Sequence, residues 1–129
     1  MTLSTVFRIQ ALVFAFFGVL MLLMPGAMME SFGIESSEIM ASMLQNFSVM
    51  ALGVAYLSWQ MPSWVGDNLK TVGMFFAILH VAFMIIAFYH MSIGLFPFDA
   101  ANIGGTLPDA VLAILLFWKS RVTPKAVKT

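Results

Sequence analysis

The chain contains no cysteine and few charged residues, and each shortage excludes a class of protein. Without cysteine it has no disulfide, thiolate metal site, CxxC redox centre or thiol nucleophile. Charged residues make up 9% of its 129 residues, six basic and six acidic. Since no basic arm can neutralise phosphates, we expect no nucleic-acid partner. HExxH, GxGxxG, a Gly-rich phosphate loop and a Ser/His/Asp set are also missing, so we predict no catalytic residues and no cofactor.

Apolar side chains dominate what is present. Hydrophobic residues account for 61% of the chain and the mean hydropathy is +0.98, whereas soluble domains are roughly half apolar. Lipid tolerates such a surface and disfavours a charged one. The lipid bilayer is therefore the first partner that we expect, and the length allows a single domain, residues 1–129.

Three stretches are long enough to cross a membrane. Residues 9–29 and 39–66 carry no formal charge, and residues 71–98 contain His80 and His90 as their titratable groups. About 20 apolar residues span the hydrocarbon as a helix, which satisfies its own backbone. We predict helices over residues 4–24, 37–60 and 68–91. A fourth, over residues 107–122, would reach only about 24 Å, so a re-entrant or interfacial helix is its alternative.

Start and stop signals mark these helix ends. Pro25 follows the first predicted helix, Ser37 precedes the second, Pro62 follows the second and Asp67 is a candidate cap of the third. Thr106 resembles the capping residue of the fourth, with a proline two positions on. The pattern predicts an all-α fold, an integral membrane four-helix bundle.

The basic residues favour four spans with both termini in the cytoplasm. Cytoplasmic segments carry an excess of Lys and Arg. Four spans place all six basic residues on one side, and they are Arg8, Lys70, Lys119, Arg121, Lys125 and Lys128. A cleaved signal peptide is disfavoured because the first apolar run is longer than about 15 residues.

Small and polar residues at helical spacing predict the packed face of each helix, since lipid does not distinguish apolar faces. The predicted stripes are Arg8, Ala11, Ala15 and Gly18; Ser42, Asn46, Gly53, Tyr56 and Gln60, with Gln45 beside them; Gly73, Ala77, His80, Met84 and Ala87; and Thr106, Asp109, Ala113 and Ser120. By helical rise, His80 and Asn46 lie at similar depths. We therefore predict a polar seam in which His80 contacts Asn46 or Gln45.

His80 is the leading ligand-binding candidate of this seam, together with Asn46, Gln45, Ser42 and Tyr56. A titratable ring near the bilayer centre is unusual and could relay a proton or bind the polar end of a ligand. A neutral packing residue explains His80 equally well. No carboxylate is expected at its depth to complete an acid–base pair.

The longer outer loop, residues 92–106, is the second candidate site, with His90, Asp99 and Asp109 as its recognition residues. Acidic side chains there could join His90 around a divalent cation, but their spacing matches no metal motif, so we predict no metal site. The chain is methionine-rich, with twelve. We interpret these methionines as flexible apolar filler rather than as copper ligands.

Several positions resemble those of a known family. Arg8, Gly18, Pro25 and the run 32–34 (Phe-Gly-Ile), followed by the run 51–56 (Ala-Leu-Gly-Val-Ala-Tyr), are similar to the small bacterial four-helix membrane proteins grouped as DoxX-like, many of unknown function. The resemblance covers most of the chain. It implies a four-helix protein of the bacterial inner membrane and implies no reaction.

Three functions remain open. The leading interpretation is a non-enzymatic accessory protein that binds a protein partner or an apolar ligand through its seam and outer loop. The second is a small transporter or channel-like homo-oligomer that uses the seam around His80. The third is a membrane enzyme that acts on a lipid or quinone.

Overall fold

The computed structural model describes residues 1–121, and in that range the chain is helical with no strand. Its helices are α1 (Leu3–Leu23), α2 (Pro25–Ser31), α3 (Glu38–Trp64), the short η1 (Gly66–Asn68), α4 (Leu69–Ser92), α5 (Ala100–Gly105) and α6 (Leu107–Arg121). Four segments are long and apolar enough to cross a membrane: α1, α3, η1 with α4, and α5 with α6. The predicted all-α fold is confirmed.

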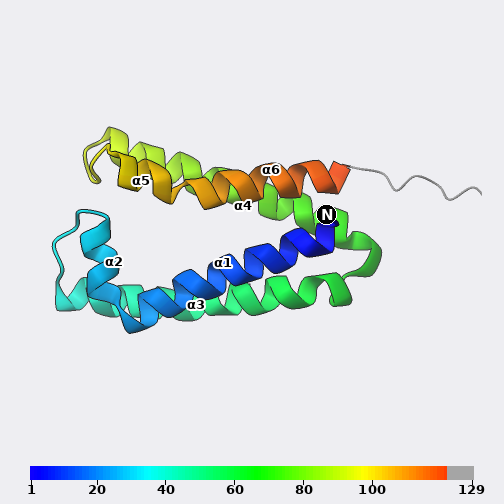
Figure 1. Ribbon diagram of the computed structural model, residues 1–129, viewed down its shortest axis with the longest axis horizontal. Helices are drawn as coiled ribbons and strands as arrows, with labels where there is room; N and C mark the ends of the chain where they lie inside the picture. Colours follow the sequence, from blue (N-terminus) through cyan, green and yellow to red (C-terminus); the bar gives the residue numbers. More distant parts are fainter. Residues whose placement is uncertain (122–129) are drawn as a thin grey trace, which may run out of the picture.

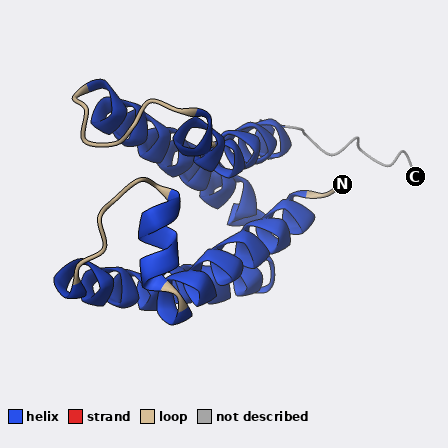
Figure 2. Ribbon diagram, turned by 60° about the vertical axis from the view of Figure 1, so that its left-hand side comes forward, coloured by secondary structure: helices blue, strands red, loops and turns tan. Residues whose placement is uncertain are grey.

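The long helices form two layers (Figure 1). One layer is α1 packed on α3, and the other is α4 packed on α6. The N-terminus, η1 and the end of α6 lie at one end of the molecule, called here the terminus end, while α2 and α5 lie at the other, the loop end. In the turned view, α2 stands between the layers at the loop end (Figure 2).

Local sequence accounts for most helix boundaries. Pro25 ends α1 because it has no N–H to donate, and it opens α2 at a position where no N–H is needed. Ser37 caps α3, with its hydroxyl accepting a hydrogen bond from the Met40 N–H at 3.2 Å. Asp99 caps α5 through the Asn102 N–H at 2.9 Å.

Three boundary predictions are wrong. Pro62 lies inside α3, which continues to Trp64, because a proline near a helix end removes one hydrogen bond without ending the last turn. Asp67 belongs to η1 and does not cap α4. Thr106 directly precedes α6, as predicted, but its hydroxyl donates to the Ile103 carbonyl at 2.8 Å, so its side chain does not cap that helix. Residue 122, the last of the predicted fourth helix, lies outside the described residues.

The two layers join through an apolar cluster in the half of the molecule nearest the terminus end. The cluster consists of Val6, Phe7, Ala77, Leu112 and Leu116, all buried. The Phe7 ring also meets the Phe76 ring edge to face, with centroids 5.7 Å apart. The cluster brings together α1, α4 and α6, and no residue of α3 belongs to it.

Glycine sets the closest helix contacts within each layer. A Cβ on Gly18 of α1 would lie 2.9 Å from the Leu52 side chain of α3. On Gly73 of α4 it would lie 2.3 Å from the Ser120 hydroxyl of α6. Small residues at such crossings let helix backbones approach in lipid, where packing drives association. Both glycines belong to the predicted inward stripes.

The predicted packed faces hold for α4 and α6 but fail for α3. Gly73, Ala77 and His80 are buried, as are Ala113 and Ser120. On α3 the buried residues are Ser48, Ala55 and Ser58, whereas Ser42, Asn46, Gly53 and Tyr56 are exposed. This helix carries two stripes of small and polar residues, and the one that packs on α1 is the one not predicted. On α1, Arg8 is also exposed, with its guanidinium 5.6 Å from the Trp59 ring centre.

Candidate functional site

Four polar side chains from four helices form a hydrogen-bonded chain between the layers. His80 Nδ1 lies 2.6 Å from Asp109 Oδ1, and His80 Nε2 lies 3.2 Å from Gln10 Oε1. The Gln10 amide nitrogen donates to Ser58 Oγ at 2.7 Å. Gln10, Ser58 and His80 are at most 2% exposed, while Asp109 is 32% exposed. Burial without partners would be unfavourable, so each group depends on its neighbour.

The helices place this chain of side chains well inside the candidate membrane spans. His80 lies 11 residues into α4, about 16 Å from its start, and Gln10 lies 7 residues into α1, about 10 Å from its start. Asp109 is near the start of α6, but α5 precedes it in the same span, so it also lies well inside. The Asp109, His80, Gln10 and Ser58 side chains therefore run from mid-span toward the terminus end.

The Gln10 amide, in the orientation that the structure gives it, indicates how many protons the His80–Asp109 pair holds. An amide oxygen only accepts, so His80 Nε2 donates to Gln10. The contact of Nδ1 with Asp109 then needs one more proton, on Nδ1 beside a carboxylate or on Asp109 beside a bare nitrogen. In both arrangements the pair has no net charge. Neutrality suits a medium in which an unpaired ion is strongly disfavoured.

If the His80–Asp109 pair loses one proton, the Gln10 side-chain amide must flip so that its oxygen and nitrogen exchange places. Neutral His80, with its proton on Nδ1 toward the Asp109 carboxylate, can only accept at Nε2. The Gln10 NH2 group must then face His80, and its oxygen must accept from the Ser58 hydroxyl. The two hydrogen bonds of Gln10 then reverse their direction, while His80 Nδ1 donates to the Asp109 carboxylate. The chain from His80 to Ser58 can thus hold two proton counts without leaving a buried polar group unpaired.

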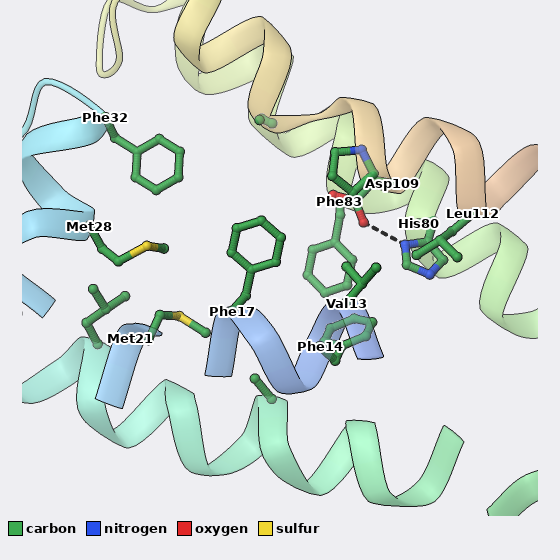
Figure 3. Close-up of a pocket in the computed structure, with 15 residues that line it drawn as sticks. Val13, Phe14, Phe17, Met21, Met28, Phe32, His80, Phe83, Asp109 and Leu112 are labelled. Atoms are coloured by element: carbon green, nitrogen blue, oxygen red, sulfur yellow. Dashed lines mark hydrogen bonds and ion pairs between the residues drawn. The ribbon is translucent and has the colours of Figure 1, made fainter. Parts of the chain in front are cut away.

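An apolar cavity of about 420 Å³ begins at this pair and extends toward the loop end. Figure 3 shows its side chains converging on the space between the layers, with His80 and Asp109 on one side and Met28 and Phe32 of the α2 region on the other. Phe14 covers the imidazole, with ring centroids 6.0 Å apart. The rest of the wall is apolar or glycine and comprises Val13, Phe17, Met21, Leu44, Ala51, Phe83, Ala87, Gly105, Pro108 and Leu112.

A second cavity, of about 340 Å³, continues from the first at the loop end. The two share Phe32, Leu44, Ala87, Gly105 and Asp109, and the second adds Asn102 and Thr106. Asp109 therefore faces both spaces, which explains why it is half-buried when its partner His80 is buried. The two layers come close together at Phe32, as shown by a Cβ on Gly105, which would lie 3.4 Å from the Phe32 ring.

The predicted contact between His80 and Asn46 or Gln45 is wrong. Asn46 and Gln45 are exposed on α3, since the inward face of this helix is rotated from the predicted one. Gln45 instead donates to the Leu22 carbonyl at 3.2 Å, at the end of α1 where Pro25 leaves carbonyls free. Ser42 and Tyr56 are exposed as well, and Tyr56 contacts the Trp64 ring edge to face. None of these four candidates lines the main cavity.

The outer-loop candidates separate in the structure. Asp109 belongs to the His80 pair, so the expectation that no carboxylate reaches the depth of His80 is also wrong. His90 packs against the Phe96 ring, with centroids 5.8 Å apart, and Asp99 caps α5. Within residues 1–121, no three His, Asp or Glu side chains lie close enough to hold a metal ion.

Gln10 and Ser58 are the site residues that the sequence prediction missed. Gln10 is the single amide of the first span, in which Arg8 is the single charged residue, and a buried amide in lipid needs a partner. Ser58 lies on the inward α3 stripe with Ser48 and Ala55, at intervals of seven and three residues. Both features are visible in the sequence. The other stripe of α3, which carries Asn46, is more polar and therefore led to the wrong inward face.

Neither protein-family models, nor curated proteins, nor solved structures match this chain. The DoxX-like resemblance therefore stays a prediction. Fold and composition define an all-α protein with four helices able to cross a membrane.

Proposed function

We propose that this protein is a small, non-enzymatic membrane protein that binds an amphiphilic ligand between its two helix layers. The observation that carries the proposal is the apolar cavity of about 420 Å³ that ends on the His80–Asp109 pair. Ligand sites are commonly concave and mainly apolar with a few fixed polar groups, and cavities of roughly 300 to 1,000 Å³ suit small molecules.

The wall indicates the chemistry of the ligand. Aromatic rings and methionines suit a flexible apolar chain, because thioether and aromatic surfaces adapt to irregular shapes. The part of Asp109 left exposed offers a carboxylate oxygen or a carboxyl proton to a polar head. A lipid with a neutral, hydrogen-bonding head group fits both parts. A free anion does not, since no Lys or Arg among residues 1–121 lines the cavity.

Filling the cavity tests the proposal. Ala87 of α4 lines both cavities, and Ala87→Phe would occupy the space. We expect wild-type protein extracted from native membranes in mild detergent to retain one lipid class at near stoichiometric amount, measured by mass spectrometry of solvent extracts. The Ala87→Phe variant should lose most of it.

Ala82→Phe is the matched control, because Ala82 lies on the same helix with its side chain exposed and lines neither cavity. It should retain the lipid. Equal lipid profiles in wild type, Ala87→Phe and Ala82→Phe, with all three correctly folded, would show that the cavity binds nothing specific.

A proton-exchanging role, as in an enzyme acting on a lipid or quinone or in a small transporter, is the second candidate. The favouring observation is the 2.6 Å contact between His80 and an Asp109 that faces the cavity. Infrared spectra of the protein in lipid, titrated with acid and base, should show the Asp109 carboxyl and Gln10 amide bands changing together. Asp109→Asn should abolish both changes, while Asp99→Asn should leave them. An amide band that ignores the titration would contradict this role.

We also propose an inner-membrane location with both termini in the cytoplasm. Arg8, Lys70, Lys119 and Arg121 belong to the half of the molecule at the terminus end, whereas Glu30, Glu35 and Glu38 belong to the loop end. Lys125 and Lys128 lie outside the described residues. Because the chain has no native cysteine, single cysteines at Thr2 and Glu35 report each side. In intact cells an impermeant maleimide should label Glu35→Cys only; labelling of Thr2→Cys instead would reverse the orientation.

A further inference from the structure

The least apolar of the four spans is also the one that the fold buries least. Among the spans, α3 has the lowest hydropathy and the smallest buried share, with Ser48, Ala55 and Ser58 as its buried residues. It lies on the outer side of its layer, away from α4 and α6 (Figure 1). Lipid favours the opposite arrangement, because a polar group facing hydrocarbon lacks partners. A polar helix on the outside indicates that another protein surface covers it.

Residues on the outward face of α3, four of them polar, follow the spacing of a helix-pairing surface. Ser42, Asn46, Val49, Gly53, Tyr56 and Gln60 recur at alternating intervals of four and three residues, and we call them the α3 seam. Five of these residues are exposed and Gln60 is half-buried. Apolar or small residues at this period form the contact line between paired helices. The seam lies opposite the face that packs on α1, which contains Ser48, Ala55 and Ser58.

Asn46 is the amide of the seam nearest to the middle of the hydrocarbon, and it needs a partner there. Its side chain makes no hydrogen bond to any of residues 1–121. It lies 8 residues into α3, about 12 Å along a helix of about 40 Å. Centred on about 30 Å of hydrocarbon, that helix would place Asn46 roughly 7 Å below the lipid surface. An amide at this depth gains from a hydrogen bond across a helix interface.

We propose that the α3 seam binds the α3 seam of a second copy of this chain. A carboxamide is self-complementary, since it donates through its NH2 group and accepts through its oxygen. The seam carries no formal charge, so two copies meet without repulsion. Two copies inserted with one topology are related by a twofold axis along the membrane normal, which makes their α3 helices parallel and sets Asn46 opposite Asn46.

Gly53 allows the two α3 backbones to approach as closely as such a pair needs. A Cβ at this position would meet nothing within 4 Å, so the glycine is not required by packing inside one chain. It lies seven residues after Asn46, on the same side of the helix. Glycine at a membrane helix crossing lets two backbones come together, and an amide two turns away fixes their register. This reasoning is independent of the ligand proposed above.

A cysteine scan in native membranes tests the contact directly, because the chain has no cysteine of its own. Single cysteines at positions 42, 46, 49 and 53 should form disulfide-linked dimers under mild oxidation. A cysteine at exposed Phe47, on the flank of the seam, should crosslink much less, and one at buried Ser48 should not crosslink. Equal crosslinking at Phe47 and Gly53, or none at any position, would overturn the proposal.

Two substitutions measure the strength of the contact. Energy transfer between labelled full-length chains in liposomes gives the dissociation constant, which Asn46→Leu should raise about threefold to twentyfold. Gly53→Leu should raise it at least as much, while Asn46→Gln should restore part of the loss because it keeps the amide. Ala82→Leu, on the exposed face of α4, is the matched control and should have no effect. Unchanged association in both seam variants, or α3 crosslinks to a different protein, would refute self-pairing.

Discussion

The terminus half and the loop half of this molecule are built from the same four spans and are packed by different rules. Toward the terminus end, Phe7, Ala77 and Leu116 bring three helices into direct contact, and the polar chain of His80 is fully paired. Toward the loop end, the layers enclose two cavities lined by Phe17, Phe32 and other apolar groups. The comparison indicates that stability is concentrated in one half, which leaves the other half free to accommodate a ligand.

Truncating a phenylalanine in each half should show the largest difference. Phe7→Ala removes a fully buried ring from the cluster, and we expect the free energy of unfolding to fall by about 3 kcal/mol. Phe17→Ala, on the same helix, enlarges an existing cavity and should lower it by less than about 1 kcal/mol. Unfolding in mixed micelles, followed by tryptophan fluorescence, measures both. Equal losses would show that the two halves are equally well packed.

Replacing His80 should have the next largest effect on the free energy of unfolding. His80→Leu leaves Asp109 and Gln10 without their shared partner, and we expect stability to fall by about 1 to 3 kcal/mol. His90→Leu is the control, because His90 lies near the loop end and makes ring contacts without a side-chain hydrogen bond among residues 1–121. It should change stability by less than about 0.5 kcal/mol. A larger effect at His90 would reverse the assignment of the two histidines.

Glycine-to-alanine substitutions test how tightly the helices pack in each half. Gly73→Ala would place a Cβ against the Ser120 hydroxyl, so either this side chain or the α4–α6 contact must rearrange. We expect a loss of about 1 to 2 kcal/mol, seen as a lower unfolding temperature in detergent. Gly104→Ala at the loop end meets open space and should leave that temperature unchanged or slightly higher. A tolerated Gly73→Ala would mean that the α4–α6 crossing is loose.

The smallest expected effect on stability is that of Gln45, whose side chain contacts the last turn of α1. Gln45→Ala removes the amide that donates to the Leu22 carbonyl, and stability should fall by about 0.5 kcal/mol. Thr71→Ala, an exposed change on α4 without a hydrogen-bonded side chain in the described range, should have no effect in the same unfolding assay. Indistinguishable variants would remove the capping role assigned to Gln45.

The number of long apolar spans could be predicted from the sequence because hydrocarbon thickness imposes a strict length on each span. Three predicted helices agree with α1, α3 and α4 to within a few residues. The fourth was predicted as too short, at about 24 Å, and that shortness was itself the signal that the span begins earlier. Helix α5 supplies the missing length, with Asp99 as its cap.

The site was harder to predict because lipid gives no apolar signal for which side of a helix faces inward. On α4 a single stripe contained His80, and it was placed correctly. On α3 two stripes competed, and side-chain polarity alone favoured the one that carries Asn46. The depth of Asp109 depended on the helix start, so an error in one boundary hid the partner of His80.

The single shared proton of the His80–Asp109 pair has an electrical consequence. A group without net charge feels no force from the transmembrane potential, whereas one elementary charge moved across the whole membrane is worth about 2.3 kcal/mol per 100 mV. With the proton bound, the pair responds little to voltage. In a membrane-inserted chain, loss of the proton would leave a negative charge on Asp109, and the same field would then act on the helices that hold it.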